Sequence, residues 1–453
     1  MDNKTQLQAN NERINALTEL LKNKTAGGGG SGSSGLDING LLKQALVKEG
    51  TTVFKGDFVS LIESLRTSSS TYTGYGARII EVTENVYFAV TGYNSNRMFA
   101  YVIQCSKNSI TTTVKQINST TNSCYGRPIL VKINDTTVFI AHSYSGSWYL
   151  YGTVVTIDGT TITVQKTSQL SSASASFYTG AQGYDSLQGT GLLYDTNKVL
   201  ICVPYGGYYN CYAFRFEIGE DFSITQIGDY LNVVPTYQLI RNCQLVNDST
   251  VLVTSCGASS NASNGQYGGI YKINLEDWTS TVVMNRLPAL SGETKRARSY
   301  ALNETTMLYV TNDTATTFQI CLIDIPNQSI IFQTQTNTPF KIEFDIQKIG
   351  VDKFAVLGRA STTGGLMILQ TKNNTVEVLE TYTLKTTIGI NGEVGDIVYD
   401  ENLGAFIYYG SYAMLIYLTP YATPISTNSD TIGGVAKDDG NSGDLIEVFV
   451  PNV

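Results

Sequence analysis

Histidine and charge are both scarce in this chain. It has one histidine, His142, among 453 residues, which excludes any site that needs two imidazoles, including a His-Glu-x-x-His zinc site. Charged residues make up 15%, well below the roughly 25% of an ordinary soluble domain. The net charge of -8 argues against a nucleic-acid partner, which needs clustered Lys and Arg. We therefore expect no catalytic residues, no metal site and no cofactor.

Paired cysteines and long apolar runs are missing as well. The seven cysteines are odd in number and contain no Cys-x-x-Cys pair, which disfavours a disulfide framework. No stretch approaches the roughly 18 apolar residues that span a bilayer. Residues 1–6 open a polar segment with no apolar signal region. We expect no membrane insertion and, if the protein leaves a cell, no secretory signal of its own.

Residues 1–26 carry a heptad pattern. Leucine and isoleucine occupy its two seam positions, with an asparagine at one of them, which predicts a short coiled coil whose register and oligomer number the asparagine sets. A lone amphipathic helix docked on another surface is the alternative. The predicted oligomerisation residues are Leu7, Asn10, Ile14, Leu17 and Leu21.

A flexible Gly/Ser linker, 27–35, separates this helix from the remainder of the chain. Residues 36–71 then show two short helical patterns, from Ile38 to Lys48 and from Asp57 to Leu65. We interpret them as a helical collar.

From residue 72 to 424 the sequence changes to short strands separated by Gly, Asn, Asp and Ser turns. A polar turn followed by a β-branched or aromatic strand recurs seven times. The first apolar residues of the copies are separated by 52, 61, 52, 56, 47 and 52 residues, near the period of ~40–50 residues of four-stranded propeller blades. We therefore predict a mainly β protein with a seven-bladed β-propeller. The seven anchors are Val86, Val138, Val199, Val251, Met307, Phe354 and Phe406.

The seventh copy differs from the others at its end. Six copies turn into a fourth strand, most plainly at Asp158-Gly159, but the seventh reaches Pro420 and Pro424, which we expect to end its third strand. A closed ring cannot tolerate the open edge. We predict that the segment around Ser70 to Tyr75 supplies the missing strand. Both chain ends would then lie opposite the face that carries the loops between second and third strands.

That face is the candidate binding surface. Its predicted loops are rich in Tyr, Ser, Gly and Asn with an occasional Trp, as in antibody loops, and could stack on sugars or seat a protein epitope. The alternative is that the aromatic residues only cap blade ends. The candidate residues are Tyr93, Tyr144, Trp148, Tyr184, Tyr205, Tyr208, Tyr209, Tyr267 and Tyr412.

Features that suggest catalysis are weak. The carboxylate pairs Asp185 with Asp195 and Glu343 with Asp345 could serve glycoside hydrolysis, but we interpret them as turn-making residues. His142 is expected at a strand end, and the basic cluster 295–298 is expected to form a solvated turn.

The last segment, 425–453, predicts a small C-terminal β-hairpin module. Its Gly-Val-Ala-Lys at 434–437, followed by Gly-Asp-x-Ile-Glu-Val-x-Val-Pro at 443–451, resembles a terminal module in structural proteins of phages and prophages of Gram-positive bacteria. The opening residues 7–14 are similar to the short helical starts of their tail-fibre and baseplate-associated proteins. The resemblance covers only the two ends and carries no catalytic motif, and the propeller matches an architecture alone.

The resemblance implies a phage virion structural protein, a fibre or adhesin that displays the propeller for host attachment. The N-terminal region would form a homotrimer and bind other virion proteins, and three propellers would combine weak contacts with a bacterial cell-surface glycan or protein. Assembly in the host cytoplasm and release by lysis agree with free cysteines and the missing signal. The alternatives are a baseplate, neck or capsid decoration protein without receptor binding, and a polysaccharide depolymerase.

Overall fold

The structure is a computed structural model in which every described element is a β-strand. The described residues contain no helix of a length and apolarity that would cross a membrane. The predicted coiled coil, its seam residues Leu7, Asn10, Ile14, Leu17 and Leu21, and the Gly/Ser linker lie outside the described residues. The residues that the structure describes are 42–48, 51–55, 58–66, 78–91, 98–107, 109–117, 127–143, 149–171, 189–205, 210–234, 238–257, 268–287, 297–312, 317–360, 363–387, 395–410, 412–424, 434–436, 439–441 and 445–449.

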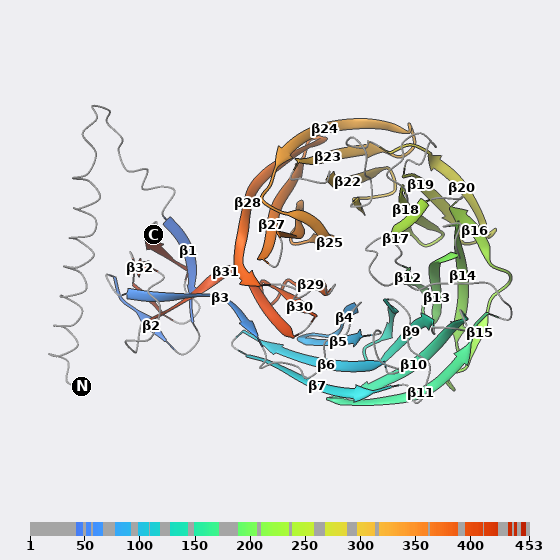
Figure 1. Ribbon diagram of the computed structural model, residues 1–453, viewed down its shortest axis with the longest axis horizontal. Coiled ribbons are helices and arrows are strands. Elements are labelled where there is room, and N and C mark those ends of the chain that lie inside the picture. Colours follow the sequence, from blue (N-terminus) through green and yellow to red (C-terminus); the bar gives the residue numbers. More distant parts are fainter. Residues whose placement is uncertain are drawn as a thin grey trace.

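The described strands form seven blades around a common axis (Figure 1). Blade 1 is β4 (Arg78–Thr83), β5 (Val86–Thr91), β6 (Phe99–Ser106) and β7 (Ser109–Gln116). Blade 2 is β8 (Ile129–Asn134), β9 (Thr137–Ser143), β10 (Leu150–Asp158) and β11 (Thr161–Gln169). Blade 3 is β12 (Thr190–Asp195), β13 (Lys198–Tyr205), β14 (Asn210–Ile218) and the short β15 (Ile224–Gln226) and β16 (Leu231–Val234), which both pair with β14.

The other blades repeat this order. Blade 4 is β17 (Gln238–Asn247), β18 (Thr250–Gly257), β19 (Ile270–Asn274) and β20 (Thr279–Met284). Blade 5 is β21 (Arg298–Ala301), β22 (Thr306–Asn312), β23 (Thr317–Asp324) and β24 (Ser329–Asn337). Blade 6 is β25 (Lys341–Lys348), β26 (Lys353–Ala360), β27 (Thr363–Lys372) and β28 (Thr375–Thr387). Blade 7 begins with β29 (Asp396–Asp400), β30 (Ala405–Tyr409) and β31 (Ala413–Pro424).

The sequence repeat and the blades coincide, which confirms the predicted propeller. Each of the seven anchor residues lies in the second strand of its blade. These strands are buried almost throughout, as in β9, because both of their faces pack against neighbouring blades, whereas an outer strand such as β24 is largely exposed. The predicted Asp-Gly turn joins β10 to β11, and Gly159 adopts the positive φ of 58° that favours glycine.

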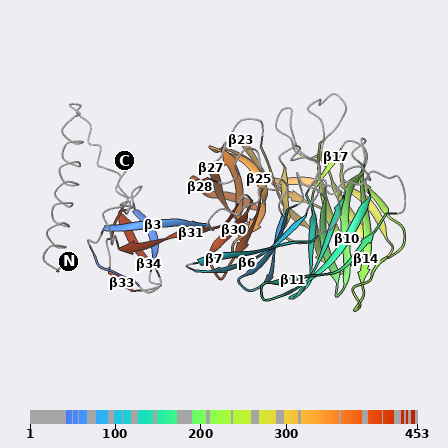
Figure 2. The same ribbon diagram turned by 60° about the horizontal axis from the view of Figure 1, so that its bottom comes forward.

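The seventh blade is closed by β3 (Phe58–Arg66), a strand from upstream of the first blade. It pairs antiparallel with β31, with Ser64 opposite Ile416 and Val59 opposite Pro424. The expected mode of closure is therefore confirmed, but the donor segment is not the predicted Ser70 to Tyr75. Figure 2 shows β3 and β31 running together out of the ring.

The third strand of blade 7 does not end before its prolines, which corrects that expectation. β31 runs through Pro420 to Pro424. Its register with β3 shifts between Ile62 and Ser64, where the partner residue jumps from Tyr421 to Ile416. Pro420 falls within this bulge, where its missing N–H interrupts no ladder bond.

The prediction of a helical collar is wrong, because the described part of residues 36–71 forms β-strands. They are β1 (Leu42–Val47), β2 (Thr52–Val53) and β3. The spacing that fits one helix face also fits a strand in so short a segment, and pairing with β31 and with the C-terminal strands decides between them.

The C-terminal strands are β32 (Gly434–Ala436), β33 (Gly440–Asn441) and β34 (Leu445–Phe449). β32 and β34 pair antiparallel, as predicted, but they are not a separate unit. β34 also pairs with β1, β1 with β31, β31 with β3, and β3 with β32, which closes a circuit of five strands. We call this circuit, with β2 and β33, the terminal module. It has a small core of Ala45, Val47, Val53, Val59, Ala436, Ile446 and Val448.

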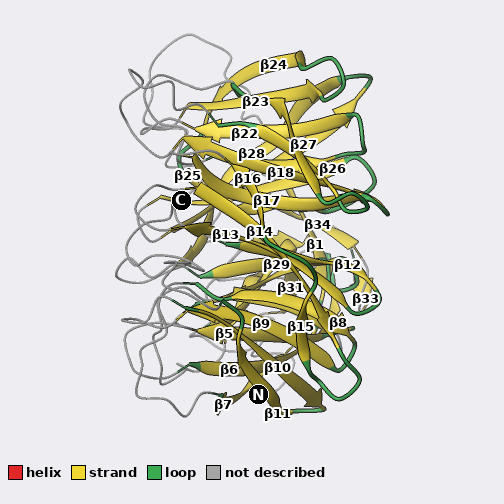
Figure 3. Ribbon diagram, turned by 90° about the vertical axis from the view of Figure 1, so that its right-hand side faces the viewer, coloured by secondary structure: helices red, strands yellow, loops and turns green. Residues whose placement is uncertain are grey.

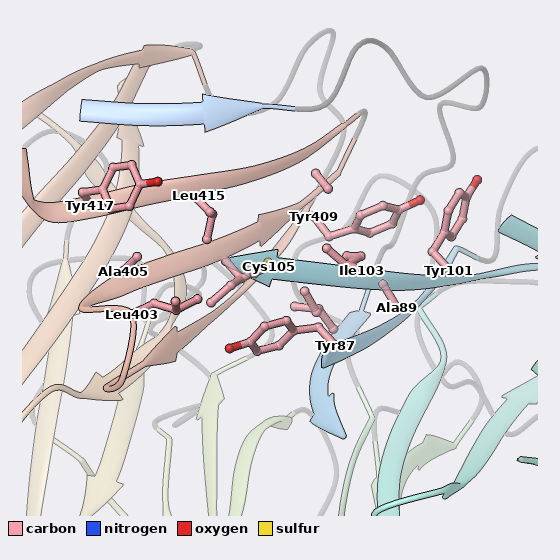
Figure 4. Packing of buried hydrophobic residues seen from close by; sticks show 13 residues of the cluster. Tyr87, Ala89, Tyr101, Ile103, Cys105, Leu403, Ala405, Tyr409, Leu415 and Tyr417 are labelled. Atoms are coloured by element: carbon pink, nitrogen blue, oxygen red, sulfur yellow. The ribbon is translucent and has the colours of Figure 1, made fainter. Parts of the chain in front are cut away.

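The seam between blades 1 and 7 has an apolar core (Figure 4), and two of its tyrosine hydroxyls also form hydrogen bonds. The rings of Tyr101 and Tyr409 lie 4.8 Å apart. The Tyr87 hydroxyl donates to the buried carboxylate of Asp400, and the Tyr417 hydroxyl donates to the Lys107 carbonyl at 2.7 Å. The borrowed strand β3 is thus added to a blade that already packs tightly on its neighbour.

The two ring faces differ. Short turns between first and second, and third and fourth, strands lie together at one edge, as Figure 3 shows in green. The second-to-third and inter-blade connections leave from the opposite ends of the strands. β31 begins at Ala413, directly after the second-to-third connection of blade 7. Its other end, at Pro424, lies in the terminal module. The direction of β31 therefore carries the described chain from the loop end of blade 7 toward the terminal module.

Candidate functional site

Two of the predicted binding residues lie in the described part of the chain, and neither lies openly on the surface. Tyr412 is buried, with its ring 6.1 Å from that of Tyr408 in the core between blades 6 and 7, so its assignment as a binding residue is wrong. Tyr205 is half-buried at the end of β13, with its ring edge-on to Tyr212 at 5.4 Å. The remaining candidates, Tyr93, Tyr144, Trp148, Tyr184, Tyr208, Tyr209 and Tyr267, fall outside the described residues.

The described residues instead bring charged side chains together along the axis. A cavity of about 260 Å³ lies among the inner strands β4, β8, β12, β25 and β29. Its polar wall includes Arg78, Glu81, Asp345, Gln347 and Asp396. Aliphatic side chains of β4, β8 and β29 and residues 189–191 of blade 3 form the rest. Five different blades contribute to this one cavity.

Asp396 is the centre of contacts at one end of the cavity. Its carboxylate accepts a hydrogen bond from the Ile79 N–H at 3.1 Å and lies 3.8 Å from the Arg78 guanidinium and 3.5 Å from that of Arg127. Arg78 also donates to the Gly189 carbonyl of blade 3 at 3.3 Å. These groups link blades 1, 2, 3 and 7 across the axis.

A second ion pair joins blades 5 and 6. The Arg298 Nε lies 2.9 Å from the Asp345 carboxylate, and the Arg298 side chain is 5% exposed against 41% for Asp345. A bulge in β25 between Ile342 and Ile346 places Asp345 toward the axis. Because Arg298 is buried, it does not belong to the solvated turn expected for 295–298.

Blade 4 adds a further buried arginine. Arg241 lies where the register of β17 shifts between Ile240 and Asn242, and its Nε donates to the Cys256 sulfur at 2.8 Å. Arginines from the first strands of blades 1, 4 and 5, and from just before the first strand of blade 2, thus lie inside the ring.

The other acidic side chains differ in their surroundings, from Glu81 in the cavity wall to Asp195 on the surface. The pKa of Glu81 is raised, first by burial and then by the charge of Asp400. Asp195 forms an exposed pair with Lys198 at 2.7 Å, and Asp185 falls outside the described residues. No group of three or more His, Cys, Asp or Glu side chains suited to a metal occurs where the structure describes the chain.

His142 lies at the end of β9, as predicted, and is completely buried. Its Nε2 is 2.9 Å from the Thr153 hydroxyl, and its ring stacks on Tyr151. Burial lowers the pKa of His142 to about 3, which keeps the ring neutral at ordinary pH. It is therefore a core residue, and a proton transfer at its ring would have to take place inside blade 2.

Sequence reasoning missed the axial site. A weak signal exists: Arg78, Arg298 and Asp396 are each the first residue of a blade's first strand. Charged residues at corresponding positions of a closed ring face one another around its axis, although nothing local indicates which of them pair.

Comparison with known proteins identifies no family for this chain. No family model matches the chain, and no curated protein matches it. Among solved structures it is similar to a candidate 6-phosphogluconolactonase of Bacteroides fragilis, at 9% identity over 78% of this chain and 87% of that one, with a TM-score of 0.45. It is also similar to YCF48 bound to a D1 peptide (8% identity, 82% and 99% covered, TM-score 0.47) and to a puromycin hydrolase (10%, 78% and 56%, TM-score 0.44).

Proposed function

We propose that the protein is a phage virion structural protein, a fibre or adhesin that presents the loop face of its propeller to the host surface. One observation carries the proposal. The first and last described strands, β1 to β3 and β32 to β34, meet in the terminal module, which is continuous with blade 7 through β3 and β31. Anchoring through this module would leave the loop face clear.

The geometry of β31 supports that orientation. Its first half pairs with β30 and β3 inside blade 7, whereas Tyr421 and Ala422 pair with β1 and β3 in the terminal module. One strand thus spans both units, and a load on the module passes directly into the ring.

The sequences of the two ends and of the loops support the same role. The terminal motif at 434–451 resembles modules of phage structural proteins, and the segments of the opposite face are rich in Tyr, Ser, Gly and Asn. Under this proposal the N-terminal region binds other virion proteins and forms a homotrimer, and the ring binds a cell-surface glycan or protein without a chemical step. The protein is assembled in the host cytoplasm and reaches the virion before lysis.

The test uses phage particles and the full-length chain. Gold-labelled antibody against the chain should decorate particles, and the purified chain should compete with their adsorption to host cells. Tyr144→Ala with Trp148→Ala should weaken this competition, whereas Tyr230→Ala, at a side chain 55% exposed on blade 3, should not.

Each outcome is informative. Labelled particles whose adsorption the chain does not block would identify a baseplate, neck or capsid decoration protein instead of an adhesin. Particles that never carry the label would refute a virion role. A truncated chain for such work should lack no more than residues 1–41, because removal through residue 71 would delete β3.

A further inference from the structure

The Arg78–Asp396 end of the axial cavity lies on the side of the proposed attachment face. Arg78 and Asp396 are the first residues of their strands, and they pair with Val90 and Tyr409 near the ends of the second strands, where the second-to-third connections begin. A ligand bound at the loop face would therefore reach the Arg78–Asp396 end of the cavity first.

Charge in and around the cavity is balanced. Glu81, Asp345 and Asp396 provide three carboxylates of the wall, and the guanidinium groups of Arg78, Arg127 and Arg298 lie in or next to it. An anion would meet the carboxylates and a cation would meet the arginines, so neither gains a net Coulomb advantage. A neutral ligand suits such a wall better.

The ion pairs of Asp396 are longer than direct hydrogen bonds, and its carboxylate keeps acceptor capacity for a ligand. Its distances of 3.8 Å and 3.5 Å to Arg78 and Arg127 exceed the ~2.7–2.9 Å of a direct charge-assisted hydrogen bond. A hydroxyl that lies beside such a pair can accept a hydrogen bond from the guanidinium and donate one to the carboxylate. A carboxylate accepts up to about four hydrogen bonds, and Asp345, 41% exposed, also keeps acceptor capacity beside Arg298.

Apart from Thr190, the rest of the wall is apolar and shaped by glycine. Ile80, Ile129 and Val398 line it, and Gly189 and Gly191 lie where a Cβ would collide with Ile129. A ligand with hydroxyl groups at its edge and C–H groups on its faces matches this combination of hydrogen-bonding and aliphatic surface. A cavity of about 260 Å³ suits one ring better than a chain of them.

We propose that the axial cavity binds a single neutral sugar residue, whose hydroxyl groups bridge the carboxylates and guanidinium groups of the inner strands. The inference rests on the proposed attachment function, because it names the ligand class for that function. Asp345 and Asp396 accept hydrogen bonds from sugar hydroxyls, Arg78 donates to them, and the aliphatic wall contacts a ring face.

The experiment titrates the full-length chain with glucose, galactose and N-acetylglucosamine, followed by ligand-observed NMR. We expect millimolar binding of at least one of them, weakened about tenfold or more by Asp345→Asn. Glu81→Gln should also weaken it, whereas Glu84→Gln, the same change in the exposed turn between β4 and β5, should not. The melting temperature of each variant shows whether it remains folded, and Glu81→Gln provides a second test if Asp345→Asn unfolds.

Failure to bind any of the three sugars would overturn the proposal, as would equal affinity in the wild-type chain and a folded cavity variant. Binding of inorganic phosphate in their place would show an anion site and overturn it too. None of these results depends on phage adsorption. A chain that blocks adsorption but binds no sugar would therefore refute sugar binding in the cavity and leave the proposed attachment role standing.

Discussion

His142 should make the stability of the protein depend on pH in a way that one substitution removes. It is the only histidine of the chain and is fully buried, and its pKa is lowered from 6.5 to about 3 in the folded protein by desolvation. In the unfolded chain the ring titrates near 6.5. Below that pH the unfolded state binds a proton that the folded state does not accept.

The sign and size of the effect are set by linkage. Because the unfolded state holds more protons between pH 6.5 and 3, the free energy of unfolding falls as the pH falls through that window. From pH 8 to pH 5 the loss from this ring is about 2 kcal/mol. Nearly all of it comes at or below pH 7.

The assay compares the wild-type chain with His142→Gln, whose neutral amide can still bond to the Thr153 hydroxyl. Urea unfolding of both proteins at pH 8, 7, 6 and 5 gives the difference in their free energies of unfolding. Titration of the carboxylates changes the free energy of unfolding equally in both chains, so it cancels in the difference. We expect the wild-type protein to lose about 2 kcal/mol relative to the variant between pH 8 and pH 5.

Two results would refute this reasoning. One is a free energy of unfolding that changes with pH by the same amount in the wild-type chain and in His142→Gln. The other is a proton NMR titration of the single imidazole in the folded protein with a midpoint near 6.5, since that would place the ring in contact with water.

Three further perturbations test the packing of the ring. Tyr87→Phe removes the hydroxyl that donates to the buried carboxylate of Asp400 and should cost about 2 kcal/mol in urea unfolding, and no change would show that the Leu403 N–H, at 2.8 Å, satisfies this carboxylate without the hydroxyl. Gly358→Ala places a Cβ against the Lys341 carbonyl in blade 6 and should lower the melting temperature by several degrees, whereas Gly350→Ala, with its nearest atom at 3.6 Å, should not; equal effects would refute the close approach. In a Cys124→Ser chain the other six cysteines are all buried, so Ellman's reagent at pH 8 should label them only as the protein unfolds, and rapid labelling of the folded chain would contradict their burial.

The blades could be predicted because their determinants are local. Each copy combines a polar turn with a β-branched strand, and residues adjacent in sequence pair through tight turns such as that at Gly159. The need for a borrowed strand came from the same local pattern, since the seventh copy has no fourth strand of its own after Tyr417.

The identity of that strand depended on distant contacts. Phe58, Ile62 and Leu65 fit a helical face as well as a strand, and only pairing with β31, more than 300 residues away, fixes the choice. Pro420 misled for the opposite reason, because a bulge in the register removes the ladder bond that proline cannot make.

The axial cavity could not be predicted from the sequence for the same physical reason, because distant residues form it. Arg78 bonds to Gly189, 111 residues away, and Arg127 bonds to Gly395, 268 residues away. Ring closure alone brings such groups together. The predicted tyrosine face, in contrast, was inferred from loop composition, and Tyr412 shows that an aromatic residue between strands can belong to the core.

Cross-linking of β3 to β31 would show whether the upstream strand really seals blade 7. Ser60 and Thr423 are directly opposed in this antiparallel pair, which places their Cα atoms ~4.5–5.5 Å apart, within reach of a disulfide. The full-length Ser60→Cys/Thr423→Cys chain should form that bond on mild oxidation, detected by peptide mass spectrometry, and the Ser60→Cys/Ile416→Cys control should not. No bond in the first chain, or equal yields in both, would contradict the closure and with it the pairing of the upstream and C-terminal strands in one module.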